Sequence, residues 1–354
     1  MKWGVLFAGI GGVDFGLLAA GHDIAWAIEN DAVAAQCYRW NHVAPMIEQD
    51  VRTVDVTTLA PIDALWLSPV CKSHSVARSK HLPEREDADI GVAALPYIAY
   101  HQPHTVIIEN VAGYRKHPSL THIVTFLAKR GYTIDMRVLN FADYGVPQHR
   151  KRLIVIARQG IISWPTPLQR ISWYDAIEDL LPTLPETTLA NWQFRRWQQK
   201  YEQGTCMVNG AFVFGSDTQC VTSKDNVSPT ITASHNNRDR RIVLPATMID
   251  GRLGYNDGDG TWDLREIQHT NPSNTITASD NNMKRRIVFG DARVLQVTPR
   301  VLARLQTLPD TCIFPDRAVD ACKLIGNAVP PLFVQHLTAG MSTHRTAKAV
   351  EMTI

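Results

Sequence analysis

The first half of the chain alternates short apolar stretches with helical patterns, and this alternation constrains the fold more than any other feature. Helical patterns are expected over residues 13–20 and about 31–41, and strands at residues 2–7, 23–29, 46–48, 62–67, 105–108, 132–139 and 153–157. Strands that are apolar along their whole length are typical of a parallel sheet with both faces covered by helices. The pattern therefore predicts a doubly wound, mostly parallel α/β domain.

The composition excludes several classes of protein. With 45% hydrophobic and 20% charged residues, the chain has ample apolar surface for a core, so wholesale disorder is excluded. It has no run of about 18 apolar residues, so no membrane span is expected. The six cysteines are scattered without a Cys-x-x-Cys pair, which argues against a disulfide framework and against a metal site. We expect a soluble protein of a reducing compartment, whose net charge of +2 permits an anionic partner.

The alternating pattern stops near residue 158. From there to residue 293, Gly, Asn, Asp, Ser and Thr become frequent, and helical periodicity returns only from Thr298. The sequence therefore predicts a discontinuous domain made of residues 1–158 and 294–342. A smaller, mainly irregular or β-rich domain at residues 159–293 would be inserted in it, and residues 343–354 would form a tail.

The middle region contains an internal repeat. The segment that begins Asn226-Val-Ser-Pro-Thr-Ile-Thr-Ala-Ser and ends Arg-Arg-Ile-Val recurs from Asn271 as Asn-Pro-Ser-Asn-Thr-Ile-Thr-Ala-Ser and again ends Arg-Arg-Ile-Val. Each copy is predicted as a hairpin, with a Thr-Ile-Thr strand, an Asn-Asn turn and a second strand. The basic pair and the hydroxyl groups suit a phosphate backbone and base edges, although a duplicated hairpin with a purely solvated surface explains the pattern equally well.

A glycine-rich turn, Phe7-Ala-Gly-Ile-Gly-Gly12, joins the first strand to the first helix, where the backbone can approach a ligand. A dinucleotide fingerprint would have a third glycine at Asp14, so NAD and a dehydrogenase activity are disfavoured. Glu29 ends the second strand, where a carboxylate can bind ribose hydroxyls. Asp50 follows the third strand and could accept from an adenine amino group. Groups that could bind ribose and adenine, without a site for a pyrophosphate, indicate S-adenosylmethionine as the ligand.

Three further groups lie where predicted strands begin or end. Cys71 follows the fourth strand and is either a nucleophile or a buried structural thiol. Glu109 ends the fifth strand and is either functional or a solvated carboxylate. The segment Gln148-His-Arg-Lys-Arg152 precedes the last strand and is either functional or a basic surface loop. A thiol, a carboxylate and arginines beside a methyl donor outline conjugate addition to a pyrimidine.

Together these motifs resemble the cytosine-C5 DNA methyltransferases of bacterial and phage restriction–modification systems. The resemblance covers almost the whole chain and rests on eight motifs in the family's order: Phe7–Gly12, Glu29, Asp50, Pro69-Val-Cys71, Glu109-Asn-Val, Gln148-x-Arg-x-Arg152, Arg300-x-x-Ala-Arg-Leu-Gln-x-x-Pro-Asp310 and Gly326-Asn-Ala-Val-Pro330. It implies a Rossmann-like, S-adenosylmethionine-dependent catalytic domain with an inserted target-recognition domain.

The resemblance also implies roles for individual residues. Cys71 would add to C6 of a cytosine flipped out of the duplex, and the methyl group would pass to C5, leaving S-adenosylhomocysteine. Glu109 would bind N3 of the ring and Arg152 its O2. Arg150 and Asn110 would support the catalytic loop around Cys71.

The cofactor site implied by the resemblance draws on both ends of the chain. Residues 326–331 are expected to return to the first domain and pack beside the glycine-rich turn. The cofactor-lining residues would be Phe7, Ala8, Gly9, Gly11, Gly12, Glu29, Asn30, Asp50, Val51, Pro69, Ile90, Asn327 and Ala328.

The expected DNA contacts lie in the nucleophile loop and in the repeat: Lys72, Ser75, Thr230, Arg240, Arg241, Thr275, Lys284, Arg285 and Arg286. Thr275-Ile276 matches the Thr-Leu/Ile pair that the family uses against the DNA backbone, which makes Thr230-Ile231 an extra copy. The nucleophile loop departs from the family's Pro-Pro-Cys-Gln at Val70 and Lys72. We interpret it as a variant active loop, because the other motifs are intact.

Two alternatives remain at this stage. An RNA (tRNA) cytosine-C5 methyltransferase shares these motifs, but the long middle region and the absence of a Cys-Phe-Thr signature disfavour it. A catalytically weak DNA-binding homologue is suggested only by Val70 and Lys72. Double-stranded DNA is the expected partner and a separate cognate restriction endonuclease a second one. We expect a DNA-associated cytoplasmic monomer, since one active site per chain suffices.

Overall fold

The computed structural model describes residues 1–69, 86–187 and 293–342, and short segments at 211–213, 221–223, 227–228, 230–231, 241–244, 252–256, 262–266 and 285–288. It consists of two compact units. The first unit comprises Met1–Glu178, Val227–Arg238 and Thr298–Ile354, and the second comprises Asp179–Asn226 and Asp239–Val297. The expected boundaries were 158 and 294, whereas residues 159–178 and the repeat segment 227–238 belong to the first unit and residues 294–297 to the second.

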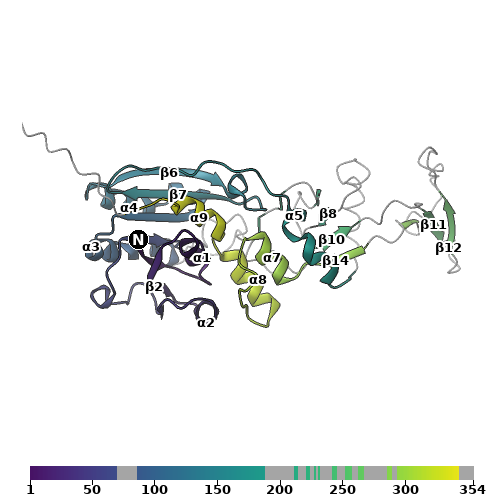
Figure 1. Ribbon diagram of the computed structural model, residues 1–354, viewed down its shortest axis with the longest axis horizontal. Coiled ribbons are helices and arrows are strands. Elements are labelled where there is room, and N and C mark those ends of the chain that lie inside the picture. The colour runs from purple at the N-terminus through teal and green to yellow at the C-terminus, as the bar shows by residue number, and fades with distance from the viewer. Residues whose placement is uncertain are drawn as a thin grey trace, which may run out of the picture. The chain divides into compact units, whose positions relative to one another are not determined.

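The first unit is built on a seven-stranded sheet with the order β3-β2-β1-β4-β5-β7-β6 (Figure 1). Neighbours from β3 to β5 pair in parallel, whereas β7 is antiparallel to both β5 and β6. The sheet is therefore mostly parallel and doubly wound, as the sequence predicts. Its strands are β1 (Lys2–Leu6), β2 (Asp23–Glu29), β3 (Met46–Glu48), β4 (Ala64–Leu67), β5 (Thr105–Val111), β6 (Thr133–Asn140) and β7 (Lys151–Arg158).

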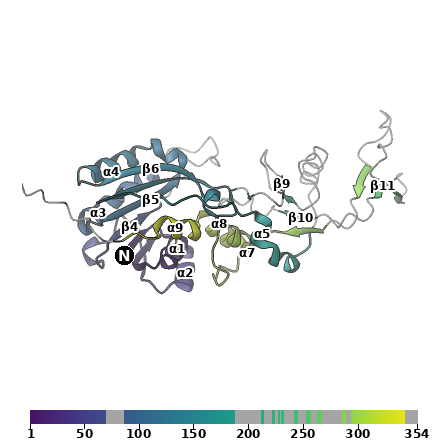
Figure 2. The same ribbon diagram turned by 45° about the horizontal axis from the view of Figure 1, so that its top comes forward.

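Alternate side chains of the central strands enter two separate cores, because successive residues of a strand point to opposite faces. On one face, Trp3 and Trp66 pack in a cluster with residues of α1 (Gly12–Ala19), α2 (Ala32–Asn41) and α9 (Pro331–Thr338). On the other, Leu65 and Ile108 pack with residues of α3 (Leu95–His101) and α4 (Pro118–Ala128). Figures 1 and 2 show these two helical layers with the sheet between them.

The C-terminal segment returns to the first unit through α7 (Pro299–Leu305), α8 (Ala318–Asn327) and α9. The α7 helix begins with a proline, which needs no N–H partner in a first helical turn. Helix α9 packs against α1, and Phe333 stacks on Phe141 with a centroid separation of 3.8 Å. The short helix α5 (Trp173–Ile177) also belongs to this unit and contacts α7.

The described strands of the second unit form two small antiparallel sheets. One has the order β14-β10-β8-β9, from β8 (Ala211–Val213), β9 (Val221–Ser223), β10 (Arg241–Leu244) and β14 (Arg293–Gln296). The other has the order β12-β11-β13, from β11 (Arg252–Asn256), β12 (Trp262–Glu266) and β13 (Arg285–Val288).

The first repeat copy does not form the predicted hairpin. Its Arg-Arg-Ile-Val strand is β10, which pairs with β14 along one edge and with β8 along the other. Its Thr230-Ile231 segment instead lies beside Gln148 in the first unit, where Gln148 and Ser228 form a parallel bridge. The hairpin prediction failed because local pairing signals do not reveal that both edges of β10 are taken by strands distant in sequence.

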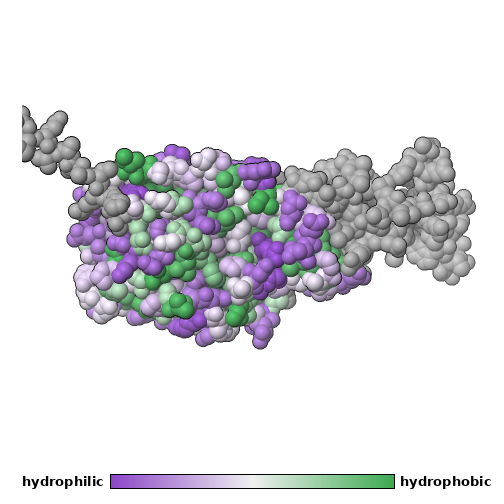
Figure 3. Space-filling view, viewed as in Figure 1, coloured by the Kyte–Doolittle hydropathy of each residue, from purple (hydrophilic) through white to green (hydrophobic). Residues whose placement is uncertain are grey.

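Hydrophobic and hydrophilic residues are interspersed on the face of the described residues shown in Figure 3. Within the described part of the chain, no helix is both long and apolar enough to cross a membrane.

Candidate active site

The glycine-rich turn lies at the carboxyl end of β1, at the edge where open parallel sheets bind ligands. Phe7, Gly9 and Gly11 have φ angles of 61°, 57° and 84°. A positive φ at a non-glycine residue such as Phe7 is strained and is typical of functional turns. The backbone N–H of Gly9 donates to Glu29 Oε2 at 2.9 Å, so the turn is fixed to the end of β2.

Glycine is required in this turn because the backbone is closely covered on two sides. A Cβ atom at Gly11 would lie 2.1 Å from the ring Nε2 of His42, and one at Gly12 would lie 2.4 Å from the Val329 carbonyl oxygen. The C-terminal segment therefore packs directly against the turn, which confirms the expected return of residues 326–331. Ala328 is buried and Asn327 is exposed at the end of α8.

Two carboxylates follow at the same edge. Glu29 accepts the backbone N–H groups of Asn30 and Asp31 with its second oxygen, both at 2.9 Å. Asp50, just beyond β3, accepts from Arg52 at 2.6 Å. Hydrogen bonding from Arg52 lowers the pKa of Asp50, which keeps this carboxylate ionised.

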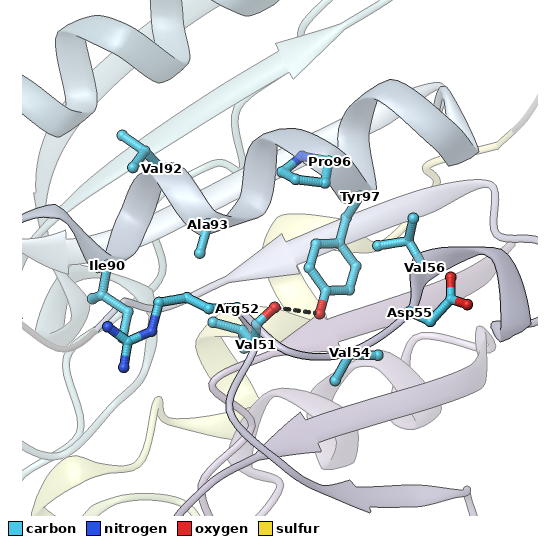
Figure 4. A pocket seen from close by; sticks show the side chains of 10 residues that line it. All are labelled: Val51, Arg52, Val54, Asp55, Val56, Ile90, Val92, Ala93, Pro96 and Tyr97. Carbon is cyan, nitrogen blue, oxygen red and sulfur yellow. Dashed lines mark hydrogen bonds between the residues drawn. The ribbon is translucent and has the colours of Figure 1, made fainter.

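A cavity of about 530 Å³ opens at Val51 and Arg52, the two residues that follow Asp50 in the chain (Figure 4). Apart from Arg52 and Asp55 its lining is apolar or aromatic: Val51, Val54, Val56, Ile90, Val92, Ala93, Pro96 and Tyr97. Tyr97 donates from its hydroxyl to the Val51 carbonyl oxygen at 2.8 Å, which fixes one wall. Val51 and Ile90, both predicted from the sequence to line the cofactor, thus border the same cavity, and Arg52 is a lining residue that the sequence did not indicate.

Glu109 and Arg152 form a buried ion pair between β5 and β7. Arg152 Nε lies 3.0 Å from Glu109 Oε1, and the two side chains are 15% and 9% exposed. Arg152 is opposite Val111 in the antiparallel register, so Glu109 is its diagonal neighbour on the same face of the sheet. Burial lowers the pKa of Arg152, and the adjacent Glu109 carboxylate opposes that shift.

Asn110 connects this pair to the segment that carries the predicted nucleophile. Its side-chain amide donates to the Pro69 carbonyl oxygen at 2.9 Å and accepts from the Val111 N–H at 2.8 Å. Pro69 is buried and is the last described residue before position 86. Cys71, Lys72 and Ser75 lie outside the described residues.

Arg150 is buried and holds three segments of the first unit together. Its guanidinium donates to the carbonyl oxygens of Ile231, Gly326 and Ala328 at 3.0–3.3 Å. Burial and the neighbouring Arg152 lower its pKa well below the usual range. These hydrogen bonds fix the carbonyl groups of the segments that meet at Arg150.

Gln148 forms a second buried junction that the sequence indicated only as part of a motif. It accepts from the Ile231 N–H at 2.8 Å and donates to Gln306 Oε1 at 2.7 Å, and Gln306 donates to the Ile325 carbonyl oxygen. Thr230 donates from its hydroxyl to the His149 carbonyl oxygen. Among the described residues, the segment that lies beside this motif thus comes from the first repeat copy and not from the second.

For the remaining residues predicted to contact DNA, the structure describes either the backbone alone or nothing. Arg241 begins β10, and Arg285 and Arg286 begin β13. Arg240, Thr275 and Lys284 lie outside the described residues.

Comparisons with known proteins identify the family of this chain. The family model for the C-5 cytosine-specific DNA methylase matches residues 1–343. Type II methyltransferase M.AplI of Arthrospira platensis is 28% identical over 354 residues, covering 99% of this chain and 85% of the relative. Type II methyltransferase M.DdeI of Desulfomicrobium norvegicum is 25% identical over 387 residues, covering 95% and 87%.

The fold is shared with a solved protein of an Escherichia coli prophage that is described as a DNA modification methyltransferase. The TM-score is 0.60 at 18% identity, over 96% of this chain and 98% of that one. The S. pombe Dnmt2 methyltransferase gives 0.57 at 16% identity, over 96% and 97%. Because the family model spans nearly the whole chain and its motifs meet at one sheet edge, this chain belongs to the C-5 cytosine-specific DNA methylase family and is a DNA cytosine-5-methyltransferase.

Proposed function

We propose that Cys71, Glu109 and Arg152 carry the methylation of cytosine, with Asn110 and Arg150 as positioning residues. The observation that carries the proposal is the buried Glu109–Arg152 pair, beside which Asn110 holds the Pro69 carbonyl two residues before Cys71. A carboxyl group and a guanidinium on one face match the N3 and O2 edge of a cytosine.

In this proposal the Cys71 thiolate forms a bond to C6 of a flipped cytosine. Glu109 places a proton at N3, so the electron pair released from the C5–C6 double bond is available at C5. When bound, S-adenosylmethionine supplies the methyl group that C5 receives. The C5 proton then leaves to water, its electron pair restores the C5–C6 double bond, and the C6–S bond breaks to release the Cys71 thiolate. N3 returns its proton to Glu109, so that neutral 5-methylcytosine leaves and the carboxyl group regains its starting state.

The Glu109–Arg152 pair supplies a switch for this chemistry. Without DNA, Arg152 lies 3.0 Å from the Glu109 carboxylate and holds it as an acceptor. When Arg152 turns its guanidinium to the cytosine O2, Glu109 loses its counterion and can hold a proton at N3. Entry of the base thus prepares the acid that the reaction needs.

The residues beside β1, β2 and β3 fit S-adenosylmethionine. The turn at Gly9 brings bare backbone to the helix N-terminus, Glu29 provides a carboxylate for ribose hydroxyls, and Asp50 an acceptor for the adenine amino group. The apolar walls of the cavity at Val51 and Ile90 suit the flat faces of the aromatic adenine ring.

The test is methyl transfer by the full chain to mixed genomic duplex DNA, with S-adenosylmethionine and base-resolution sequencing of 5-methylcytosine. Modification at one short motif is expected, with none in Cys71→Ser and a loss of roughly 10²–10⁴-fold in Glu109→Gln. Near-normal turnover by Glu109→Gln would remove Glu109 from the mechanism. Transfer to tRNA but not to DNA would overturn DNA as the substrate of this site.

The named relatives are Type II methyltransferases, and we further propose that this chain, as a cytoplasmic monomer, protects DNA from a separately encoded endonuclease. Plasmid DNA from cells that express the chain should resist one restriction endonuclease of a panel, and DNA from Cys71→Ser cells should be cut.

A further inference from the structure

Three exposed cations lie at the end of the sheet that carries the buried Glu109–Arg152 pair. Arg115 and Lys116 lie in the 3₁₀ helix Ala112–Lys116, which begins directly after β5, and Lys151 is the first residue of β7. Among the described residues, none of these three side chains has a hydrogen bond or an ion pair. They are therefore available to a ligand outside the unit.

The sheet register places the three cations at one end of the strands. The pairing of β5 with β7 ends at Val111 opposite Arg152, so the helix Ala112–Lys116 begins where Lys151 starts β7. Contacts between this helix and β7 keep the two elements together. Arg115, Lys116 and Lys151 thus lie at the same end of the sheet as Glu109.

The electrostatics of the edge change from one half to the other. At the ends of β2 and β3, Asp31 is paired with Lys323 and Asp50 with Arg52, and Glu29 accepts backbone N–H groups, so most cations and carboxylates there have partners. Near β5 and β7, Glu109 is already paired with Arg152, and the described Asp143 is paired with Arg170. The three exposed cations there have no carboxylate counterion, and such a cluster attracts a polyanion.

We propose that Arg115, Lys116 and Lys151 form a phosphate clamp for the DNA strand that carries the target cytosine. The proposal rests on the proposed function, because that function places the cytosine at Glu109. The clamp holds the backbone and reads no base, since exposed cations on a helix and a strand end offer charge rather than a base-specific pattern. It adds to the contacts expected in the repeat and in the Cys71 loop.

The experiment is a salt titration of duplex DNA binding with the full-length protein. Fluorescence anisotropy with two duplexes of unrelated sequence is measured between about 50 and 300 mM salt for wild type, Arg115→Ala/Lys116→Ala and Lys151→Ala. The matched control is Lys129→Ala/Arg130→Ala, which removes two cations after α4, at the opposite end of the sheet. Unfolding midpoints establish that every variant is folded.

The double variant should lose about 1.8 units of the log–log salt slope and Lys151→Ala about 0.9, equally on both duplexes. The swap Arg115→Lys/Lys116→Arg should restore the slope, and the control should match wild type. If the double variant keeps the wild-type slope while wild type methylates DNA, the clamp is wrong and the proposed function stands. If the slope falls on both duplexes but wild type transfers no methyl group to DNA, the clamp stands and the proposed function fails.

Discussion

Two arginine–carboxylate pairs lie along one edge of the sheet, and they differ in burial. In the half at β5 and β7, the Glu109 and Arg152 side chains are 9% and 15% exposed. In the half at β3, those of Asp50 and Arg52 are 26% and 56% exposed. A buried pair fixes its partners, because an unpaired charge there is costly, whereas an exposed pair is readily replaced by water or ligand. In the proposed mechanism, the half at β5 and β7 changes its charge state once per turnover. The half at β3, called the cofactor half below, exchanges the cofactor.

The largest expected effect comes from breaking the buried pair. Arg152→Met should lose roughly 10²–10⁴-fold in the rate of single-turnover methyl transfer. The cytosine O2 loses its hydrogen-bond donor, and Glu109 loses the arginine whose movement prepares it as an acid. The substitution should also lower the free energy of unfolding by about 3–5 kcal/mol, since Glu109 is left buried and unpaired. Urea denaturation and rapid-quench transfer measure the two effects.

The control is Glu109→Gln/Arg152→Met, which removes both charges. It should recover most of the stability and none of the activity. Equal instability of the single and double variants would contradict the pairing argument.

The second effect concerns a buried cluster beneath the cofactor half. Burial raises the pKa of Asp14 to about 7 despite the hydrogen bond from Tyr38, and burial lowers the pKa of His42 to about 4. Between pH 4 and 7 the native Asp14 holds a proton that the unfolded chain has released, so its contribution to stability falls as pH rises. Native His42 lacks a proton that the unfolded chain holds, so its contribution grows as pH rises to about 6.5.

The two contributions oppose each other, and single variants should separate them. Relative to wild type, Asp14→Asn should gain stability as pH rises from 4 to 7, by on the order of 4 kcal/mol for a shift of about three pK units. His42→Asn should instead lose stability more steeply over the same interval. Urea unfolding at half-unit pH steps measures the slopes; parallel curves for all three proteins would refute the assignment.

A third, smaller effect is expected at the junction between the two halves. Arg150→Met removes the donor to the Ile231, Gly326 and Ala328 carbonyl oxygens, and should lower the free energy of unfolding by about 2–3 kcal/mol. Arg170→Met, which breaks the exposed pair with Asp143, should cost less than about 1 kcal/mol. An equal loss in both variants would mean that burial does not distinguish them.

The smallest effects belong to the exposed pair. Arg52→Ala should change the free energy of unfolding by less than about 1 kcal/mol, and should bind S-adenosylmethionine equally or up to about fivefold more tightly because Asp50 is freed. Asp50→Ala should weaken binding about tenfold or more, since the adenine amino group loses a charged acceptor. Isothermal titration calorimetry measures the affinity of each variant for S-adenosylmethionine. A weaker complex with Arg52→Ala would show that Arg52 itself contacts the cofactor.

Much of the cofactor half could be predicted from sequence because its signals are local. The glycine turn follows its strand directly, and Glu29 and Asp50 follow the next two strands in order. The role of Arg52 was missed, because no local pattern shows that its side chain bends back to Asp50. The pairing of the first repeat copy was predicted wrongly, since neither edge of β10 is used by the neighbouring Thr230-Ile231 segment.

The sequence by itself determined the class of sheet, the order of its motifs and the family, because apolar periodicity and residue spacing are carried along the chain. Only the tertiary structure decided which of those residues touch. The antiparallel insertion of β7 beside β5 brings Arg152 to Glu109, and the Asn110 side chain reaches Pro69 across 41 positions. The return of residues 326–331 gives Arg150 its carbonyl partners. Such contacts depend on which strands become neighbours, and that choice is made by burial of the two cores rather than by any local pattern.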